Sequence, residues 1–327
     1  MKFFKSKQVL ILGGLGFIGS NLAIKLVDMG ANVTILDNLL PRHGGNPHNI
    51  FPIKDKCKVD ISDLRDTSSL PDMVKNKDII FDMVGQVSHI DSMKDPFTDL
   101  EINCKSKINL LETCREHNSN AKIIFASTRQ IYGRPEYLPV DELHRINPVD
   151  INGIHKAAAE NYFSLYSTIY NMNCIGLRLT NTYGPRQYIQ GDSQGFVGIF
   201  LRLALQNKKI TMYGDGKQIR DFNYIDDVVE AFLLAAKTPK INNGVYNIGH
   251  HIKYSLLDFV KTLQKFIEVE YEYKSFPENK KNIDIGNYYT NYSAFKEKTS
   301  WSPKVDLEEG LMKTVKYFQD NLSYYLS

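Results

Sequence analysis

Short apolar runs alternate with longer amphipathic segments along the first half of the chain. Five of the runs, at 9–12, 33–36, 78–81, 122–126 and 174–177, have the length of β-strands. Segments between them, such as 100–116 and 157–170, place apolar residues three and four positions apart and contain no proline, as helices do. This alternation predicts an α/β fold, a Rossmann-type doubly wound parallel sheet covered by helices.

The pattern changes after residue 185. From there the apolar runs are shorter and less regular, and the loops are rich in Gly, Asn and Lys. We therefore predict a first domain over 1–180 and a smaller C-terminal region over 181–327, some segments of which return to the first domain.

The composition excludes several classes of protein. A hydrophobic fraction of 43% over 327 residues suffices for a sizeable core, and a net charge of +3 without a long single-sign run gives no reason to expect nucleic acid as a partner. No apolar stretch approaches the ~20 residues that span a bilayer, so we predict a cytoplasmic protein with no membrane partner. The cysteines, which lack the spacing of a zinc site or a disulfide framework and predict no metal, are Cys57, Cys104, Cys114 and Cys174.

A glycine-rich loop follows the first predicted strand. Its sequence over 13–19 has the spacing G-x-x-G-x-x-G and opens a predicted helix over 20–28. Glycines allow a tight turn and a close approach of the backbone to a pyrophosphate, while the helix N-terminus offers N–H groups to phosphates. A structural turn is the alternative interpretation. The residues predicted to bind a dinucleotide here are Gly13, Gly16, Phe17, Ile18 and Gly19.

The second predicted strand leads to Asp37 and Asn38, about twenty residues beyond the glycine loop. A carboxylate at this position accepts hydrogen bonds from the adenosine ribose and repels a 2′-phosphate. The cofactor is therefore predicted to be NAD and not NADP, although the nearby Arg42 is a residue type that would suit NADP.

Two further strand ends complete the predicted cofactor site. Asp60 and Ile61 follow the third strand, where a short polar group can reach the adenine, and Asp63 beside them fits a helix N-cap equally well. The fourth strand leads to Gly85 and Gln86, where small residues let the backbone pass close to the cofactor.

Motifs along nearly the whole chain resemble the extended short-chain dehydrogenase/reductase family, which includes NAD-dependent nucleotide-sugar epimerases, dehydratases and decarboxylases. They occur in order: the glycine loop, Asp37-Asn38, Gly85-Gln86, Asn103, Ser127-Thr128 before 131–133, Lys156, 181–186, 214–222, 226–227, 246–249 and 301–303. The resemblance implies a Rossmann-type fold, bound NAD and a nucleotide-sugar as the partner. It also implies that Asn103 and Lys156 belong to the cofactor site.

The resemblance implies a catalytic set of Ser or Thr, Tyr, and Lys four residues after the Tyr. Thr128 and Lys156 match two members, but Asn152 stands where the family has its tyrosine. The tyrosine takes a hydroxyl proton while hydride leaves the sugar carbon. An Asn amide does not titrate in the useful range and cannot do this.

Three interpretations of the missing tyrosine remain open. In the first, His155 beside Lys156, or Tyr132 near the expected nicotinamide edge, supplies proton transfer. In the second, the enzyme is slow or performs part of the usual cycle, assisted by Thr128, Asn152 and water. In the third, the chain is a non-catalytic protein that binds NAD and a nucleotide-sugar.

The residues after Thr128 narrow the reaction. The family's dehydratases and decarboxylases have acidic residues there, whereas this chain has Arg129 and Gln130. We therefore expect no dehydratase activity, but oxidation at the sugar C4, by a 4-dehydrogenase or a 4-epimerase, in the synthesis of surface-polysaccharide sugars. Epimerase-like motifs without the tyrosine also suggest similarity to a GDP-heptose 4-dehydrogenase of capsule biosynthesis.

The resemblance also predicts how the nucleotide-sugar is held and how subunits associate. Substrate-binding residues are predicted at Asn181, Arg186, Tyr213 and Arg220, where Arg220 can present two donors to a diphosphate. Segments 99–117 and 152–170 resemble the helix pair of a dimeric four-helix bundle, so we expect a homodimer or a higher homo-oligomer. Contacts would come from Leu100, Ile108, Leu111, Tyr162 and Leu165; packing within the monomer is the alternative.

Overall fold

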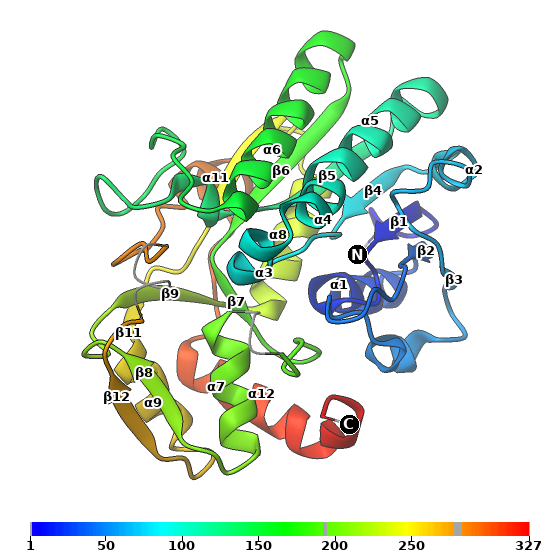
Figure 1. Cartoon of the computed structure of the whole chain (residues 1–327). Coiled ribbons are helices and arrows are strands. Elements are labelled where there is room, and N and C mark those ends of the chain that lie inside the picture. Colours follow the sequence, from blue (N-terminus) through cyan, green and yellow to red (C-terminus); the bar gives the residue numbers. More distant parts are fainter. Residues whose placement is uncertain (1, 192–194, 278–282, 327) are drawn as a thin grey trace.

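A seven-stranded parallel sheet forms the centre of the computed structural model, which describes residues 2–191, 195–277 and 283–326 (Figure 1). The strand order is β10-β6-β5-β4-β1-β2-β3, and every neighbouring pair is parallel. The strands are β1 (Gln8–Leu12), β2 (Asn32–Leu36), β3 (Lys58–Asp60), β4 (Ile79–Asp82), β5 (Lys122–Thr128), β6 (Asn173–Leu179) and β10 (Gly244–Ile248). The predicted doubly wound α/β fold is confirmed, and the five predicted apolar runs fall on β1, β2, β4, β5 and β6.

Helices cover both faces of this sheet (Figure 1). Along β1, Val9 and Ile11 enter the core shared with α1 (Phe17–Asp28) and α8 (Ile225–Lys237). Leu10 and Leu12 enter the core on the opposite face, with α2 (Leu70–Val74), α5 (Ser106–His117) and α6 (Ile151–Tyr170). Both faces of the sheet are buried, which explains why its strands are apolar almost without a break. Full burial of each such side chain stabilises the fold by roughly 1.5–3 kcal/mol.

The helix before β5 and the helix after it differ in detail from their predicted extents. The predicted segment 100–116 is made of the end of α4 (Pro96–Leu100), a wider π-type turn over Glu101–Lys105, and α5. Before them lies the short α3 (His89–Lys94). The helix predicted at 157–170 begins six residues earlier as α6, because the Asp150 side chain caps it by accepting the Gly153 N–H at 2.7 Å.

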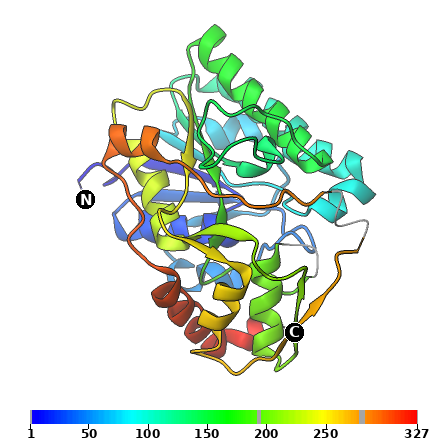
Figure 2. The same ribbon diagram turned by 90° about the vertical axis from the view of Figure 1, so that its left-hand side faces the viewer.

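The C-terminal half builds a smaller region below the large sheet, as both views show (Figures 1 and 2). Its elements are β7 (Asn181–Tyr183), α7 (Phe196–Leu205), β8 (Ile210–Tyr213), β9 (Ile219–Tyr224), β11 (Lys253–Ser255), α9 (Leu256–Leu263), β12 (Tyr271–Lys274) and α12 (Leu307–Asn321), while α11 (Ser293–Thr299) packs near β10. β10 comes from this half of the chain but pairs with β6 in the large sheet. The domain boundary at residue 180 stays a prediction.

Within the described residues, no helix has both the length and the apolar character to cross a membrane, and no group of three or more His, Cys, Asp or Glu could hold a metal ion.

On the faces of α5 and α6, Leu111 is fully buried within the monomer and is therefore not available to a partner. Leu100, Tyr162 and Leu165 are exposed. A homodimer through these helices stays a prediction.

Candidate active site

The carboxyl ends of the parallel strands open into two connected cavities. The larger has a volume of about 410 Å³ and the smaller about 80 Å³. They share five lining residues, Gly13, Gly16, His43, Met83 and Gly85. The glycine loop after β1 thus lies where the strand order reverses, which is the place where doubly wound sheets bind ligands.

The glycine loop has the geometry of a phosphate cradle. Gly13 has φ +74°, and a Cβ on Gly19 would lie 2.2 Å from the Gly13 carbonyl oxygen, so this turn excludes side chains. No side chain caps α1, whose first residues Phe17, Ile18 and Gly19 line the larger cavity. N–H groups at such a helix start attract phosphates.

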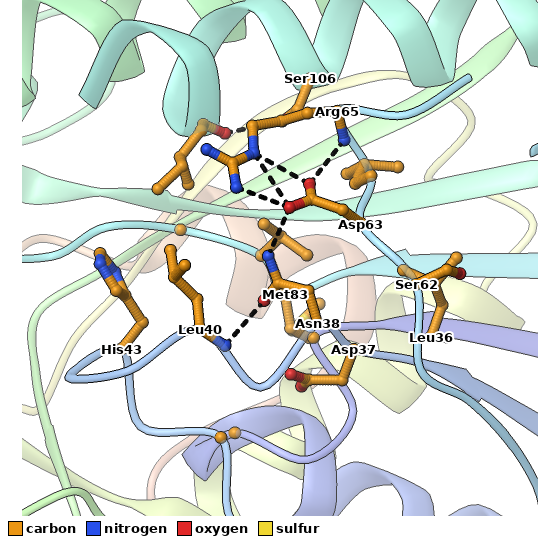
Figure 3. A pocket seen from close by; sticks show the side chains of 17 residues that line it. Leu36, Asp37, Asn38, Leu40, His43, Ser62, Asp63, Arg65, Met83 and Ser106 are labelled. Carbon is orange, nitrogen blue, oxygen red and sulfur yellow. Dashed lines mark hydrogen bonds and ion pairs between the residues drawn. The ribbon is translucent and has the colours of Figure 1, made fainter. Parts of the chain in front are cut away.

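Asp37, predicted to bind the adenosine ribose, lines the smaller cavity (Figure 3). Its carboxylate accepts the N–H groups of Leu15 at 3.0 Å and Leu39 at 2.9 Å, which hold both oxygens in place. Burial raises the pKa of Asp37, although these two hydrogen bonds oppose the shift. Each oxygen keeps a second lone pair, which suits the two hydroxyls of a ribose.

A polar network forms the wall next to Asp37 (Figure 3). Asn38 donates to Asp63 at 2.8 Å, and Arg65 donates to the same carboxylate at 2.6 Å. The hydrogen bond from Arg65 lowers the pKa of Asp63 to about 2, so this carboxylate is charged at neutral pH. Asp63 is thus a wall residue of the cavity and not an N-cap.

Adenine contacts for Asp60 and Ile61 stay predictions. Asp60 accepts a hydrogen bond from Ser62, and the Ile61 side chain is exposed; neither lines a cavity. Ser62 and Asp63 line the smaller cavity instead, because β3 ends at Asp60 and the chain turns inward only afterwards.

Asn103 fixes the loop after β4 that carries Gly85. Its amide accepts the Gln86 N–H at 3.1 Å and donates to the Gln86 carbonyl at 3.0 Å. Gln86 and Asn103 are both buried and lie behind the cavity wall, so they position the backbone of Gly85. A Cβ on Gly85 would lie 2.6 Å from Lys156 Nζ, so the end of this lysine side chain would have to shift to make room for it.

Lys156 projects from α6 into the larger cavity. Burial, helped by the neighbouring Lys107 and opposed by Asp82 and Asp99, lowers its pKa to about 8. Within the described residues its ammonium makes no hydrogen bond, so it can donate to the hydroxyls of a ligand.

Asn152, predicted from the resemblance to stand in place of a catalytic tyrosine, is hydrogen-bonded within the protein. Its amide nitrogen donates to the Gln86 carbonyl at 2.7 Å and to the Asp99 carboxylate at 2.9 Å. Its amide oxygen is buried and has no partner among the described residues, although Asn152 lines the larger cavity. Asn152 therefore joins α6 to the loop after β4 and carries no titratable group.

Neither predicted replacement base reaches the cavity. His155 donates through Nδ1 to the Asp99 carboxylate at 2.7 Å and is largely buried. Tyr132 is fully buried, donates to Asn247 at 2.8 Å and accepts from Arg178 at 2.6 Å. Burial raises the pKa of Tyr132 to about 12, despite the opposing effects of Arg178 and Asn247. Both residues therefore have structural partners and do not line the larger cavity.

A different histidine does line the larger cavity. His89, the first residue of α3, binds the Asp150 carboxylate through Nδ1 and the Gln130 amide nitrogen through Nε2 at 2.5 Å. Gln130 in turn donates its backbone N–H to Thr128 Oγ1 at 3.2 Å. Sequence reasoning missed His89. The only signal was a histidine three residues after Gln86 together with an aspartate at the N-cap of α6.

Of the four predicted substrate residues, only Asn181 lines the larger cavity. Arg186 instead donates to the Asn49 carbonyl at 2.9 Å and to Asn21 at 3.0 Å, and thereby joins α1 to the next loop. Arg220 is buried and donates to backbone carbonyls, among them that of Ile219 at 2.8 Å. Tyr213 packs near Phe276. Substrate contacts for these three residues stay predictions.

Other residues of the same wall were not predicted from sequence. Arg129 stacks on the Tyr288 ring at 5.0 Å and donates to Asn181 Oδ1 at 3.4 Å. The remaining unpredicted residues of this part of the lining are Thr180, Thr182, Gln187, Tyr188, Phe196 and Val197.

A family model described as the NAD dependent epimerase/dehydratase family matches residues 9–249. The chain belongs to this family. NAD is accordingly its cofactor, and the glycine cradle, Asp37 and Lys156 fit that dinucleotide.

Similar proteins act on nucleotide-sugars. The solved UDP-glucose 4-epimerase of Thermotoga maritima with UDP-glucose is 31% identical, with a TM-score of 0.87 over 96% of this chain and 99% of that chain. The Thermus thermophilus UDP-glucose 4-epimerase complex with NAD is 30% identical, with a TM-score of 0.84 over 95% of this chain and 99% of that chain. The CDP-paratose 2-epimerase of Salmonella typhi is 30% identical over 94% of this chain and 97% of its own length. Decarboxylases are also among the relatives, so membership alone does not choose the reaction.

Proposed function

We propose that this protein oxidises the C4 hydroxyl of a nucleotide-linked sugar with NAD, as a 4-dehydrogenase or a 4-epimerase. The larger cavity supports this most directly. One continuous wall joins the glycine cradle and Lys156, which suit NAD, to Thr128 and then Asn181, where a nucleotide-sugar would lie. The reaction would take place in the cytoplasm, in the supply of sugars for a surface polysaccharide.

The residue after Thr128 argues against a dehydratase or a decarboxylase. Arg129 occupies this position, and its guanidinium lies against Tyr288 and Asn181. A cation cannot take up the proton that elimination of water removes from a sugar carbon. Oxidation with or without re-reduction needs no carboxylate at this place.

A second candidate is a protein that binds NAD and a nucleotide-sugar without turnover. Asn152 favours it, because the amide cannot accept a proton and is already bound to Gln86 and Asp99. Against it, the cavity retains Thr128, a lysine with a lowered pKa, and a histidine.

Incubation with a panel of GDP-, UDP-, CDP- and dTDP-sugars tests the proposal. We expect one of them to give reduced cofactor, seen by NADH absorbance, or a C4 epimer, seen by NMR. A GDP-heptose is the first substrate to try, because epimerase-like motifs without the tyrosine suggest similarity to a GDP-heptose 4-dehydrogenase. Tight binding of a nucleotide-sugar without either product would favour the second candidate, and absence of binding to any of them would contradict both.

A further inference from the structure

Two histidines of this chain bind buried carboxylates through Nδ1, and they differ in what the rest of the ring faces. His155 pairs with Asp99 and is 15% exposed, and it does not line the cavity. His89 pairs with Asp150, is 33% exposed and lines the cavity near Thr128. Only the second ring is therefore placed to meet a substrate.

The partner of His89 is held rigidly. Asp150 is the N-cap of α6, with one carboxylate oxygen accepting the Gly153 N–H and the other bound to His89. Its side chain is 2% exposed. Burial would raise the pKa of Asp150, but the contacts with His89, the Gly153 N–H and the charge of Arg129 outweigh it, so its pKa is lowered. A charged carboxylate therefore faces Nδ1 at neutral pH.

This contact sets the tautomer of the imidazole. A carboxylate accepts, so Nδ1 carries the proton and the lone pair lies on Nε2. The Gln130 amide donates to that lone pair at 2.5 Å. A sugar hydroxyl that takes the place of the amide would donate to Nε2. When the ring accepts the proton, the carboxylate can balance the positive charge that forms.

We propose that His89, oriented by Asp150, is the general base that replaces the family's tyrosine; this inference rests on the proposed oxidation. The sugar O–H bond breaks and its proton passes to His89 Nε2. The C4–H bond breaks with both electrons, which pass as hydride to NAD⁺, and C4–O becomes a carbonyl. Re-reduction of the ketone returns the hydride to carbon and the proton from the imidazolium to oxygen.

Matched variants separate this role from a structural one. His89→Asn retains a donor near the Nδ1 position for Asp150 but has no counterpart of Nε2, and His155→Asn makes the same change beside Asp99. We expect His89→Asn to lower kcat by about 10²- to 10⁴-fold and His155→Asn by less than about threefold. Binding of NAD and nucleotide-sugar, measured by calorimetry, should change by less than about threefold in either variant.

Asp150→Asn tests the orientation of the ring. Asn is as good an N-cap as Asp, so the start of α6 is kept. Its amide donor, however, now faces Nδ1 and favours the tautomer protonated at Nε2. We expect kcat to fall about 10²-fold or more, and the nitrogen-15 NMR signals of His89 to change from an Nδ1-protonated to an Nε2-protonated ring. This spectrum is a readout that does not depend on turnover.

The pH dependence gives a third readout. Four charged groups surround the ring. Asp150 binds it directly, and Arg129 acts on Asp150. Lys156 lies on the same cavity wall, and Asp91 lies on the same helix. His89→Asn should change the pH profile of kcat, because the group that accepts the sugar proton in the unaltered enzyme is removed. Addition of imidazole should restore turnover to His89→Gly.

The outcomes are distinct. Equal kcat in His89→Asn and the unaltered protein, with an unchanged pH profile, would overturn the role of His89 while leaving the oxidation in place. An unchanged His89 tautomer in Asp150→Asn would overturn the role of Asp150. If the unaltered protein itself converts no nucleotide-sugar, the proposed function fails first.

Discussion

The two ends of the cleft are built from different parts of the chain. At the dinucleotide end, backbone geometry dominates: the turn at Gly13, the uncapped start of α1 and the strand end before Asp37. At the catalytic end, side-chain pairs dominate, such as Asn152 with Gln86 and His89 with Asp150. The first end holds the glycine cradle that suits NAD, whereas the second holds the side-chain pairs on which the proposed proton transfer depends.

The largest effect is expected from Gly19→Ala, which places a Cβ 2.2 Å from the Gly13 carbonyl oxygen. The loop must move, so we expect a loss of stability on the order of 2–4 kcal/mol and no measurable NAD binding. Gly16→Ala is the matched control, because its Cβ meets only that oxygen at 3.3 Å. Thermal unfolding of the two cofactor-free variants should separate them; equal melting temperatures would show that the loop is not constrained by backbone packing.

Asp37→Asn should weaken NAD binding about 10- to 100-fold, because a charged acceptor for the ribose hydroxyls is lost. Its affinity for NADP relative to NAD should rise, since the repulsion of the 2′-phosphate disappears. Asp60→Asn, a change of the same kind at the next strand end, should leave the affinity within about twofold because Asp60 lines neither cavity. Calorimetry with both dinucleotides checks this. A larger effect for Asp60→Asn would support the contact with the cofactor that the sequence predicts for Asp60.

Asn152→Ala probes the catalytic end without removing a base. The change leaves the Asp99 carboxylate and the Gln86 carbonyl each without one donor. We expect a loss of roughly 1–3 kcal/mol in the free energy of unfolding and a smaller fall in kcat than in His89→Asn. Urea unfolding and steady-state kinetics measure the two. If kcat instead falls further than in His89→Asn, Asn152 has a direct part in the chemistry.

The smallest effect concerns Lys156, whose pKa burial lowers to about 8. Below pH 8 the cofactor-free protein holds an unfavourable buried charge at Lys156. Between about pH 8 and the ordinary lysine pKa, the folded state binds fewer protons than the unfolded state. The free energy of unfolding therefore rises with pH over this range. Lys156→Met should therefore stabilise the cofactor-free protein at pH 7 by about 1–3 kcal/mol while weakening NAD binding. In the unaltered protein, NAD affinity should fall severalfold from pH 7 to pH 9, and a flat profile would contradict the role of the ammonium.

The dinucleotide end could be predicted from sequence because glycine spacing and strand ends report local backbone geometry. Gly13, Asp37 and Gly85 accordingly lie on the cavity walls. The catalytic end could not, since its pairs join residues far apart in the chain. His89 and Asp150 are 61 positions apart, and Asn152 and Gln86 are 66 positions apart. The residues next to each histidine in the sequence do not indicate whether His89 or His155 faces the cavity.

The substrate contact of Arg186 stays a prediction, and this residue shows what a motif leaves open. A motif placed this residue in a diphosphate loop, yet its guanidinium binds Asn21 and the Asn49 carbonyl. An arginine offers its donors equally to a ligand or to carbonyl and amide oxygens of the protein. Which of these it meets depends on how the C-terminal region packs against α1, and spacing along the chain does not encode that packing.

Transfer of the sugar's C4 hydrogen to NAD tests the central claim most directly. The protein would be given a nucleotide-sugar carrying deuterium at C4, and the cofactor would then be analysed by mass spectrometry. We predict deuterium in the reduced cofactor in the unaltered protein and far less in His89→Asn over the same time. A sugar that is converted while its deuterium never reaches the cofactor would contradict the account.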